Sequence, residues 1–162
     1  MNFQIVINEK DRMEEIQRLI KKGVEKAPAD VVNQINALYM NIDMLFKRFS
    51  ANIETMFTAW EGDRCIGALS VMKTQTLDTG NVICSLLFVY VEPEYRDNKV
   101  ASELMNRAVD YCREHKIYKL NMSARFEEKR QICLGINHGF KPEGYLSVDN
   151  EKYDTVVMGL RL

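Results

Sequence analysis

Residues 86–112 read LLFVYVEPEYRDNKVASELMNRAVDYC, and this stretch decides the expected fold. Its first six residues, 86–91, are apolar, aromatic or β-branched, as in a strand that is covered on both faces. Pro93 ends that strand because it has no N–H to donate to a neighbouring strand. From Val100 onward, apolar residues recur at helical spacing. The stretch therefore predicts a strand, a polar turn and a helix.

The turn between this strand and this helix is a candidate anion site. A helix that begins directly after a polar turn has N–H groups in its first turn without partners inside the helix. Those groups, together with the helix dipole, favour a phosphate. Many strand–turn–helix units bind nothing, so the pattern gives a location for an anion and leaves open whether one binds.

Length and composition narrow the class of protein. The chain has 162 residues, and we expect a single domain over residues 1–162. Its 22 basic and 23 acidic residues give a net charge of −1, without a long basic run, so nucleic acid is not an expected partner. No stretch approaches the ~20 apolar residues of a membrane span, and the first residues lack a signal-peptide pattern. We therefore expect a cytoplasmic protein that does not bind a membrane.

The cysteines do not form a metal-binding or disulfide pattern. They are widely spaced, with no C-x-x-C pair and no histidine at a zinc-ligand interval. Each lies in an apolar setting, so we expect buried free thiols and no metal. The four are Cys65, Cys84, Cys112 and Cys133.

Before the central strand, the spacing predicts a strand, two helices and a hairpin. The expected elements are a strand at 3–7, a helix opened by a capping box of Asp11 and Glu14, one long helix at 31–49 capped by Asp30, and strands at 55–60 and 65–74. Gly67 in the last of these suggests close backbone approach or a bulge. The long helix is expected to pack on a sheet, while Tyr39, Met40 and Met44 at its edge line either an acceptor groove or a dimer contact.

After the central strand, taken as 82–91, and its helix, the chain predicts three more strands and one helix. A strand at 117–124 should run parallel to the central strand, because a helix connects them. A helix at 126–137 is expected to end with Gly139 as a left-handed cap. Residues 140–148 and 153–162 should form a closing hairpin around 149–152.

Several strings resemble one enzyme family. Residues 91–101, V-E-P-E-Y-R-D-N-K-V-A, resemble the coenzyme-A-binding motif of the Gcn5-related N-acetyltransferases (the GNAT superfamily), written R/Q-x-x-G-x-G/A. Arg96 takes the first position of the motif and Ala101 the last, while Lys99 stands where the first glycine belongs. Three further strings are similar to other parts of the family. Residues 60–70, W-E-G-D-R-C-I-G-A-L-S, resemble its second hairpin, and residues 138–142, H-G-F-K-P, resemble its late G-F motif. The last seven residues resemble its final strand.

The resemblance implies a fold and an activity. The fold is α/β (α+β), with a central mixed, mostly antiparallel sheet flanked by helices in the order β-α-α-β-β-β-α-β-α-β-β. The activity is N-acetyl transfer from acetyl-CoA, the co-substrate, to a primary amine by direct attack in a ternary complex. The acceptor, a small molecule or a protein, is not identified, no metal is required, and a homodimer is left open.

The resemblance also assigns cofactor contacts by position. Backbone groups of Val89, Tyr90 and Val91 would hold the pantetheine arm and polarise the acetyl carbonyl. Arg96 would lie near the diphosphate, which would sit on the N–H groups of Asp97, Asn98, Lys99, Val100, Ala101 and Ser102. The Lys99 side chain would either contact a phosphate or lie in solvent. Three acidic residues, Glu92, Glu94 and Asp97, must face away for tight binding.

The acid and the base of the reaction stay open. Many family members have a tyrosine as general acid four residues before the glycine of the G-F motif, and this position is Gly135 here. Cys133, His138 and Tyr145 have suitable chemistry, but each also has a structural interpretation: core thiol, helix-end polar residue, strand aromatic. The family's glutamate base corresponds to Ser85, which could hold a water. Glu54, Asp78 and Glu92 remain candidates through water relays.

Two other classes of function are consistent with the sequence. One is a catalytically weak or inactive GNAT-fold module that binds CoA or a protein partner, and it predicts CoA binding without thiol release. The other is an interaction protein built around the helix at 30–50, which predicts no affinity for CoA.

Overall fold

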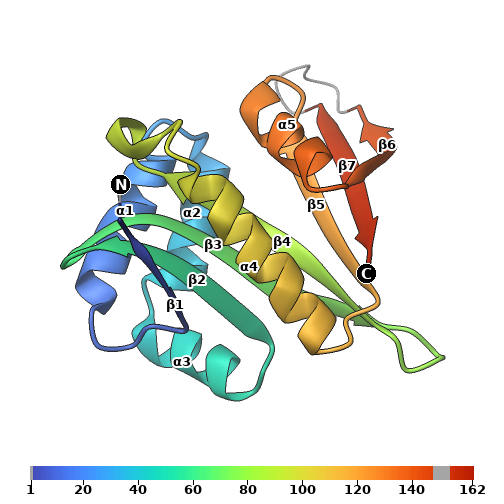
Figure 1. The fold of residues 1–162 in the computed structure, drawn as a ribbon, viewed down its shortest axis with the longest axis horizontal. Coiled ribbons are helices and arrows are strands. Elements are labelled where there is room, and N and C mark those ends of the chain that lie inside the picture. The colour runs from blue at the N-terminus through green and yellow to red at the C-terminus, as the bar shows by residue number, and fades with distance from the viewer. Residues whose placement is uncertain (1, 148–153) are drawn as a thin grey trace. The chain divides into compact units, whose positions relative to one another are not determined.

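The computed structural model describes residues 2–147 and 154–162. Seven strands follow the order β1-β2-β3-β4-β5-β7-β6 in one sheet, and helices flank them (Figure 1). In chain order the elements are β1 (Gln4–Ile7), α1 (Met13–Val24), α2 (Ala29–Tyr39), α3 (Ile42–Ser50), β2 (Glu54–Glu61), β3 (Arg64–Thr76), β4 (Val82–Val91), η1 (Pro93–Tyr95), α4 (Val100–Glu114), β5 (Lys119–Arg125), α5 (Lys129–Asn137), β6 (Lys141–Leu146) and β7 (Thr155–Arg161). The central strand, turn and helix expected from residues 86–112 are thus present as β4, η1 and α4.

The chain forms two compact units. The first unit comprises Met1–Ser70 and Phe88–Leu104, and the second comprises Val71–Leu87 and Met105–Leu162. The strands β3 and β4 and the helix α4 each begin in one unit and end in the other. The residues that the resemblance assigns to the cofactor lie between Val89 and Ser102, and all of them belong to the first unit.

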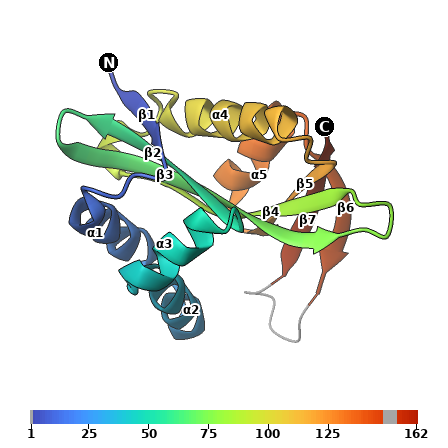
Figure 2. The same cartoon turned by 90° about the horizontal axis from the view of Figure 1, so that it is seen from below.

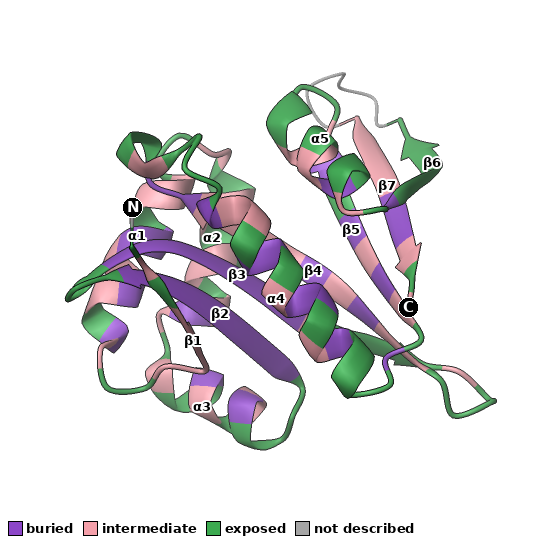
Figure 3. Ribbon diagram, in the orientation of Figure 1, coloured by how far each residue is buried: buried purple, intermediate pink, exposed green. Residues whose placement is uncertain are grey.

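In the first unit, helices α1, α2 and α3 lie on one face of the strands, as Figure 2 shows. Strand β1 pairs antiparallel with β2, from Gln4 opposite Trp60 to Ile7 opposite Phe57. Strand β2 is buried along its length except at its last residue (Figure 3). Apolar side chains of α1 at helical spacing, Met13, Ile16, Leu19 and Ile20, complete this part of the core.

Gly67 allows the first turn of α4 to lie close to β3. A Cβ atom at this position would lie 3.1 Å from Val100 and 3.2 Å from both Leu104 and Val91. Such distances are tighter than ordinary side-chain contacts, so a larger residue would push the helix away from the strand. The close approach expected at this glycine is therefore confirmed.

The prediction of one long helix at 31–49 is wrong, because the chain forms two helices there. Helix α2 ends at Tyr39 and α3 begins at Ile42. Between them Asn41 has an extended backbone, and its side-chain oxygen accepts a hydrogen bond from the Met44 N–H at 3.1 Å. This is an N-cap, which satisfies a donor at the start of α3. The continuous apolar spacing of the sequence concealed the break.

Two predicted helix caps are also wrong. Arg12 occupies the position before α1, and no side chain caps that helix. Asp11 instead donates its N–H to the Glu9 carboxylate at 2.9 Å, which closes a local turn. Helix α2 begins after Pro28, and this places Asp30 inside the first turn, where its charge still favours the helix dipole.

In the second unit, strand β4 runs parallel to β5, as the sequence predicted. The pairs run from Ile83 opposite Lys119 to Ser85 opposite Asn121. Strand β7 pairs antiparallel with both β5 and β6, and β6 is the exposed edge strand. The expected closing hairpin is confirmed in its strands, whereas its turn at 149–152 lies outside the described residues. Gly139 has φ +86°, which confirms the left-handed cap after α5.

Tyr39 faces the core, so the expectation that it forms part of a surface contact is wrong. Its exposed fraction is 0%, and its ring meets that of Phe88 edge-on, with 5.0 Å between centroids. Within the described residues the buried Tyr39 hydroxyl makes no hydrogen bond of ordinary geometry, although Ser70 and Glu54 lie close enough to interact with it. Burial and the nearby charge of Glu54 raise the pKa of Tyr39. Met44, by contrast, is 48% exposed.

The substitution Tyr39→Phe should stabilise the protein, because it removes a buried hydroxyl that makes no hydrogen bond of ordinary geometry and keeps the ring. We expect the free energy of unfolding to rise by about 1 kcal/mol, measured by denaturant unfolding. Tyr95→Phe is the matched control, since the Tyr95 hydroxyl donates to the Glu61 carboxylate at 2.8 Å, and this variant should lose stability slightly. A loss of stability in Tyr39→Phe would contradict the prediction and indicate a bridging water.

Candidate active site

The turn between η1 and α4 has an alternating backbone. Asp97 has φ +64° and Lys99 has φ +63°, while Asn98 between them is not among the residues with positive φ. Alternation of this kind turns successive N–H groups toward one side and forms a concave anion site, often called a nest. Asp97, Asn98 and Lys99 are all exposed, so the nest is accessible to a ligand from solvent.

The start of α4 adds further N–H groups to the same place. Glu103 makes an intrahelical bond here, with its N–H donating to the Lys99 carbonyl at 2.9 Å. The N–H groups of Val100 and Ala101 precede this bond in the chain and belong to the first helical turn, where amides lack the i−4 carbonyl partners of the helix interior. The positive end of the helix dipole lies at this turn. An anion would meet both the nest and the dipole here.

Lys99 occupies a left-handed conformation at the position where the family motif has glycine. A glycine adopts φ +63° without cost, whereas an L-residue pays roughly 1–2 kcal/mol for it. A backbone conformation that suits glycine is thus present at this motif position, although the residue is lysine. The Lys99 side chain is exposed to solvent.

The end of β4 is tied to this turn. Arg96 donates from Nε to the Val91 carbonyl at 3.2 Å, and its guanidinium lies 5.9 Å from the centroid of the Tyr90 ring. Asn98 donates from Nδ2 to the Arg96 carbonyl at 3.1 Å. Burial raises the pKa of Tyr90. The pairing of β4 with β5 runs only from Ile83 to Ser85, so Val89 lies beyond the last described pair.

The acidic residues near the turn are mostly neutralised. Glu92 has an exposed fraction of 0% and lies within 3.3 Å of Arg18, Lys22 and Arg64. Glu94 is 47% exposed and lies 2.8 Å from Arg64. No sequence pattern indicated these basic partners, because they come from α1 and β3, far away along the chain.

Gly23 is a second feature that the sequence did not single out. A Cβ atom on this residue of α1 would lie 2.9 Å from the Tyr90 ring. The ring therefore rests directly on the backbone of the helix. A glycine in a helix costs stability, and here the close contact with β4 accounts for it.

Three of the four candidate catalytic residues, Ser85, His138 and Tyr145, have contacts of a structural kind. Ser85 is half-buried, with its hydroxyl 3.1 Å from that of Thr74. His138 follows α5, and its Nδ1 lies 2.7 Å from the Leu134 carbonyl, so this nitrogen carries the proton. Tyr145 donates to the carboxylate of Asp154 and is 52% exposed. These placements do not single out an acid or a base.

Gly135 permits close packing and has no room for the family's tyrosine. A Cβ atom there would lie 2.6 Å from the Met122 sulfur and 2.9 Å from the Met158 methyl group. These methionines belong to β5 and β7, so the glycine lets α5 lie close to both strands. A tyrosine at this position would have to displace them.

The proposed water-relay bases differ in their surroundings. Glu54 is 1% exposed, and its carboxylate accepts hydrogen bonds from Arg48 Nε at 2.6 Å and from the Ser70 hydroxyl at 2.5 Å. Asp78 is exposed in the loop between β3 and β4. Glu92 is held in its ion pairs. Buried and bonded in this way, Glu54 and Glu92 have structural partners at both carboxylate oxygens.

The thiols divide into two groups, and the expectation that all four are buried is wrong for Cys133. Cys65, Cys84 and Cys112 are buried, whereas Cys133 is exposed on α5. Burial raises the pKa of Cys65 to about 12, of Cys84 to about 11 and of Cys112 to about 12. A protonated thiol is a weak nucleophile, so these three are unreactive at neutral pH.

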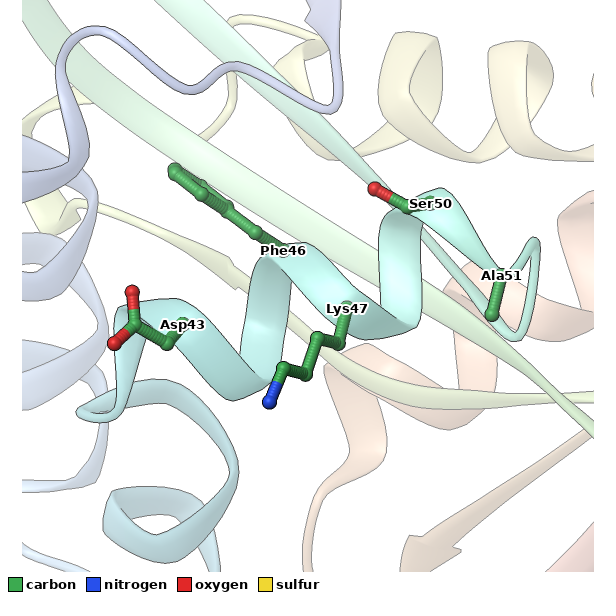
Figure 4. A pocket seen from close by; sticks show the side chains of 5 residues that line it. All are labelled: Asp43, Phe46, Lys47, Ser50 and Ala51. Carbon is green, nitrogen blue, oxygen red and sulfur yellow. The ribbon is translucent and has the colours of Figure 1, made fainter.

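One open pocket lies away from this turn, on the surface of α3. Its volume is about 570 Å³. Figure 4 shows its lining side chains projecting from one short stretch; they are Asp43, Phe46, Lys47, Ser50 and Ala51. None of them is among the residues assigned to the cofactor. The pocket therefore does not coincide with the candidate site.

Two further observations concern metals and membranes. Among residues 2–147 and 154–162, no three His, Cys, Asp or Glu side chains are grouped as metal ligands would be. Within the same ranges, no helix has both the length and the apolar character needed to cross a bilayer.

Comparison with known proteins identifies the family. Residues 17–132, more than half of the chain, match the sequence model of the family described as "Acetyltransferase (GNAT) family". The chain therefore belongs to the GNAT family of acetyltransferases. A comparison with curated protein sequences gave no significant match.

Solved structures of the same fold cover nearly the whole chain. The ribosomal-protein-alanine N-acetyltransferase of Brucella melitensis is similar with a TM-score of 0.82 at 18% identity, covering 98% of this chain and 99% of that one. The PaiA N-acetyltransferase of Thermoplasma acidophilum, solved with coenzyme A, has a TM-score of 0.75 at 17% identity, with 100% of both chains covered. The protein yncA of Salmonella typhimurium, solved with its cofactor acetyl-CoA, has a TM-score of 0.78 at 16% identity, with 98% and 93% covered. The mixed, mostly antiparallel sheet flanked by helices is the GNAT fold, as predicted.

Lys99→Gly should stabilise the protein, because glycine tolerates the left-handed conformation that lysine adopts with strain. We expect a gain of about 0.5–1 kcal/mol in the free energy of unfolding, measured by denaturant titration. Ala101→Gly in the first turn of α4 is the control, and it should cost up to about 1 kcal/mol. If Lys99→Gly lowers stability instead, the lysine side chain holds the turn in place.

Thiol labelling should separate Cys133 from the other cysteines. At about pH 8 the three buried thiols stay protonated, so a thiol-reactive disulfide reagent should label one cysteine in the folded protein and all four after denaturation. Cys133→Ser should abolish labelling of the folded protein. Labelling of a second thiol before unfolding would contradict the burial of Cys65, Cys84 and Cys112.

Proposed function

We propose that this protein is an N-acetyltransferase that moves an acetyl group from acetyl-CoA to a primary amine. The observation that carries the proposal is the backbone nest at Asp97 and Lys99, which opens α4 directly after β4 in a chain of the GNAT family. Coenzyme A or acetyl-CoA is bound in structures of two proteins of the same fold. The residues present fit the group, since the turn is exposed and leads into the first turn of a helix, where the dipole favours an anion.

Each part of the cofactor has proposed partners. The diphosphate lies on the N–H groups of residues 97–102, with Arg96 supplying positive charge beside them. The pantetheine arm runs along Val89, Tyr90 and Val91. The Val91 carbonyl already accepts from Arg96, so the backbone groups of Val89 and Tyr90, which lie beyond the last described pair of β4 with β5, are the better candidates for the arm. An N–H group of this strand would also polarise the acetyl carbonyl.

The reaction forms one bond and breaks one. The neutral amine nitrogen attacks the thioester carbon, and negative charge develops on the carbonyl oxygen, where an N–H donor stabilises it. The tetrahedral intermediate then collapses: the carbon–sulfur bond breaks, the thiolate takes a proton, and the amide nitrogen loses one to water or a base. Holding both reactants in line supplies much of the acceleration. The acceptor amine must be neutral, so we expect the rate to fall as pH decreases below its pKa.

A second candidate function is CoA binding with little or no turnover. Gly135 favours it, since Met122 and Met158 occupy the space of the family's tyrosine acid. Cys133, His138 and Tyr145 remain proposals for the acid, and Ser85 with a bound water remains a proposal for the base. Water itself can protonate a thiolate, so the missing tyrosine lowers the expected rate without preventing the reaction.

We also propose that residues 1–162 act as one domain, because β3, β4 and α4 continue from one unit into the other. A cytoplasmic location is part of the same proposal. It is supported by the four free thiols, which are usual in reducing compartments. The amine acceptor is a small molecule or a protein, and a homodimer is compatible with either.

The test combines binding and turnover. We expect CoA to raise the stability of the protein by about 2.7 kcal/mol at a concentration 100 times its Kd, measured by thermal unfolding. Acetyl-CoA with a panel of alkylamines, an N-terminal peptide and a lysine peptide should release thiol faster than acetyl-CoA alone. Arg96→Ala should weaken the CoA effect. Binding without thiol release across the panel would favour the second candidate, and no binding would reject both.

A further inference from the structure

We propose that Glu92 is a positioning residue for the diphosphate site. Its buried carboxylate fixes the end of β4 against α1 and β3, and so sets the direction of the N–H groups at 97–102. This inference rests on the proposed function, because it concerns how the same site holds coenzyme A. It goes beyond it by assigning a role to a residue that does not touch the cofactor.

The position of Glu92 in the chain makes such a role feasible. It directly follows Val91, the last residue of β4, and its N–H donates to the Ile66 carbonyl of β3 at 3.0 Å. Its own carbonyl accepts the Tyr95 N–H at 2.9 Å, which closes the turn η1. The residue therefore connects the strand with the turn that leads to the nest.

The side chain of Glu92 is held from two elements at once. One carboxylate oxygen, Oε1, accepts from Arg18 Nη1 at 2.6 Å and lies 3.3 Å from Lys22 Nζ, both on α1. The other, Oε2, accepts from Arg64 Nη2 at 2.5 Å, at the start of β3. Three cations around one fully buried carboxylate leave it little freedom to move.

Stability alone does not explain this arrangement. Removing a carboxylate from water is costly, and buried ion pairs are often no more stabilising than apolar residues of the same size. The charges balance locally, since Arg18 also binds Glu15 and Arg64 also binds Glu94. What the cluster does provide is a fixed geometry, because charge-assisted hydrogen bonds are short and directional.

Helix α1 supports the same strand end through packing. Lys22 approaches Glu92, and the next residue, Gly23, lies against the Tyr90 ring. Arg96, four residues after Glu92, donates to the carbonyl of Val91, the residue before Glu92. The residues on both sides of Glu92 are thus restrained, and the restraint continues directly into the nest.

Charge and position predict opposite effects when Glu92 becomes glutamine. Glu92→Gln keeps the size of the side chain and removes one negative charge near the diphosphate. If only charge mattered, CoA would bind more tightly. If position matters, the amide keeps one acceptor oxygen but turns an NH2 donor toward the cations on its other side, so either Arg18 and Lys22 or Arg64 lose their acceptor. The turn then shifts, and binding weakens. We expect a Kd for CoA about tenfold higher, within the range that a small displacement of binding groups produces.

The experiment measures CoA binding by calorimetry for the wild type and for Glu92→Gln. Glu94→Gln is the matched control, because it makes the same charge change and shares Arg64 and Lys22, but Glu94 is 47% exposed. The control should bind CoA as the wild type does, or slightly more tightly. S-acetylpantetheine, which lacks the diphosphate, should lose less affinity than CoA in Glu92→Gln, a difference that general destabilisation would not produce.

The outcomes are distinct. Unchanged or tighter CoA binding in Glu92→Gln overturns the inference, as does an equal loss in Glu94→Gln. If Glu92→Gln does not fold, the variant Arg64→Lys tests the inference instead. It keeps the positive charge at a half-exposed site, but a lysine cannot bind both Glu92 and Glu94. CoA should then bind several-fold more weakly, and unchanged binding would overturn the inference. Absence of CoA binding by the wild type would reject the proposed function itself.

Discussion

The close contact between β3 and the first turn of α4 is the constraint on which the candidate site depends. At Gly67 the space for a side chain is already taken by Val100, Leu104 and Val91. The start of α4 therefore lies directly beside the end of β4, and the turn between them must be short. A short turn with two left-handed residues exposes its N–H groups, because they cannot all form intrahelical bonds.

Several glycines in this protein permit close contacts, and three of them join a helix to a strand or its side chains, each with a different partner. Gly67 admits the start of a helix to a strand, Gly23 admits the Tyr90 ring to a helix, and Gly135 admits two methionines of the sheet to α5. The third differs from its family, where a tyrosine is common. The same packing that gives α5 its place leaves no room for such a side chain, so the proposed reaction has to rely on other groups or on water.

Buried charge is concentrated in the first unit. Glu54 and Glu92 are both buried, and each is bonded to arginine. Glu54 connects α3 with β2 and β3, while Glu92 connects α1 and β3 with the end of β4. Such pairs contribute more to a defined geometry than to net stability, and the proposed cofactor site lies directly after one of them.

The sequence by itself determined the local elements and the place of the candidate site. The strand–turn–helix unit of residues 86–112, the parallel strand after it and the left-handed Gly139 follow from apolar spacing and from the conformational limits of proline and glycine. The break between α2 and α3 at Asn41 was not predicted, because the apolar spacing of the sequence continues through it. Only the tertiary structure decided the partners of Glu92, the burial of Tyr39 and the exposure of Cys133. Those facts depend on contacts between residues far apart in the chain, and such contacts leave no periodic trace in a single sequence.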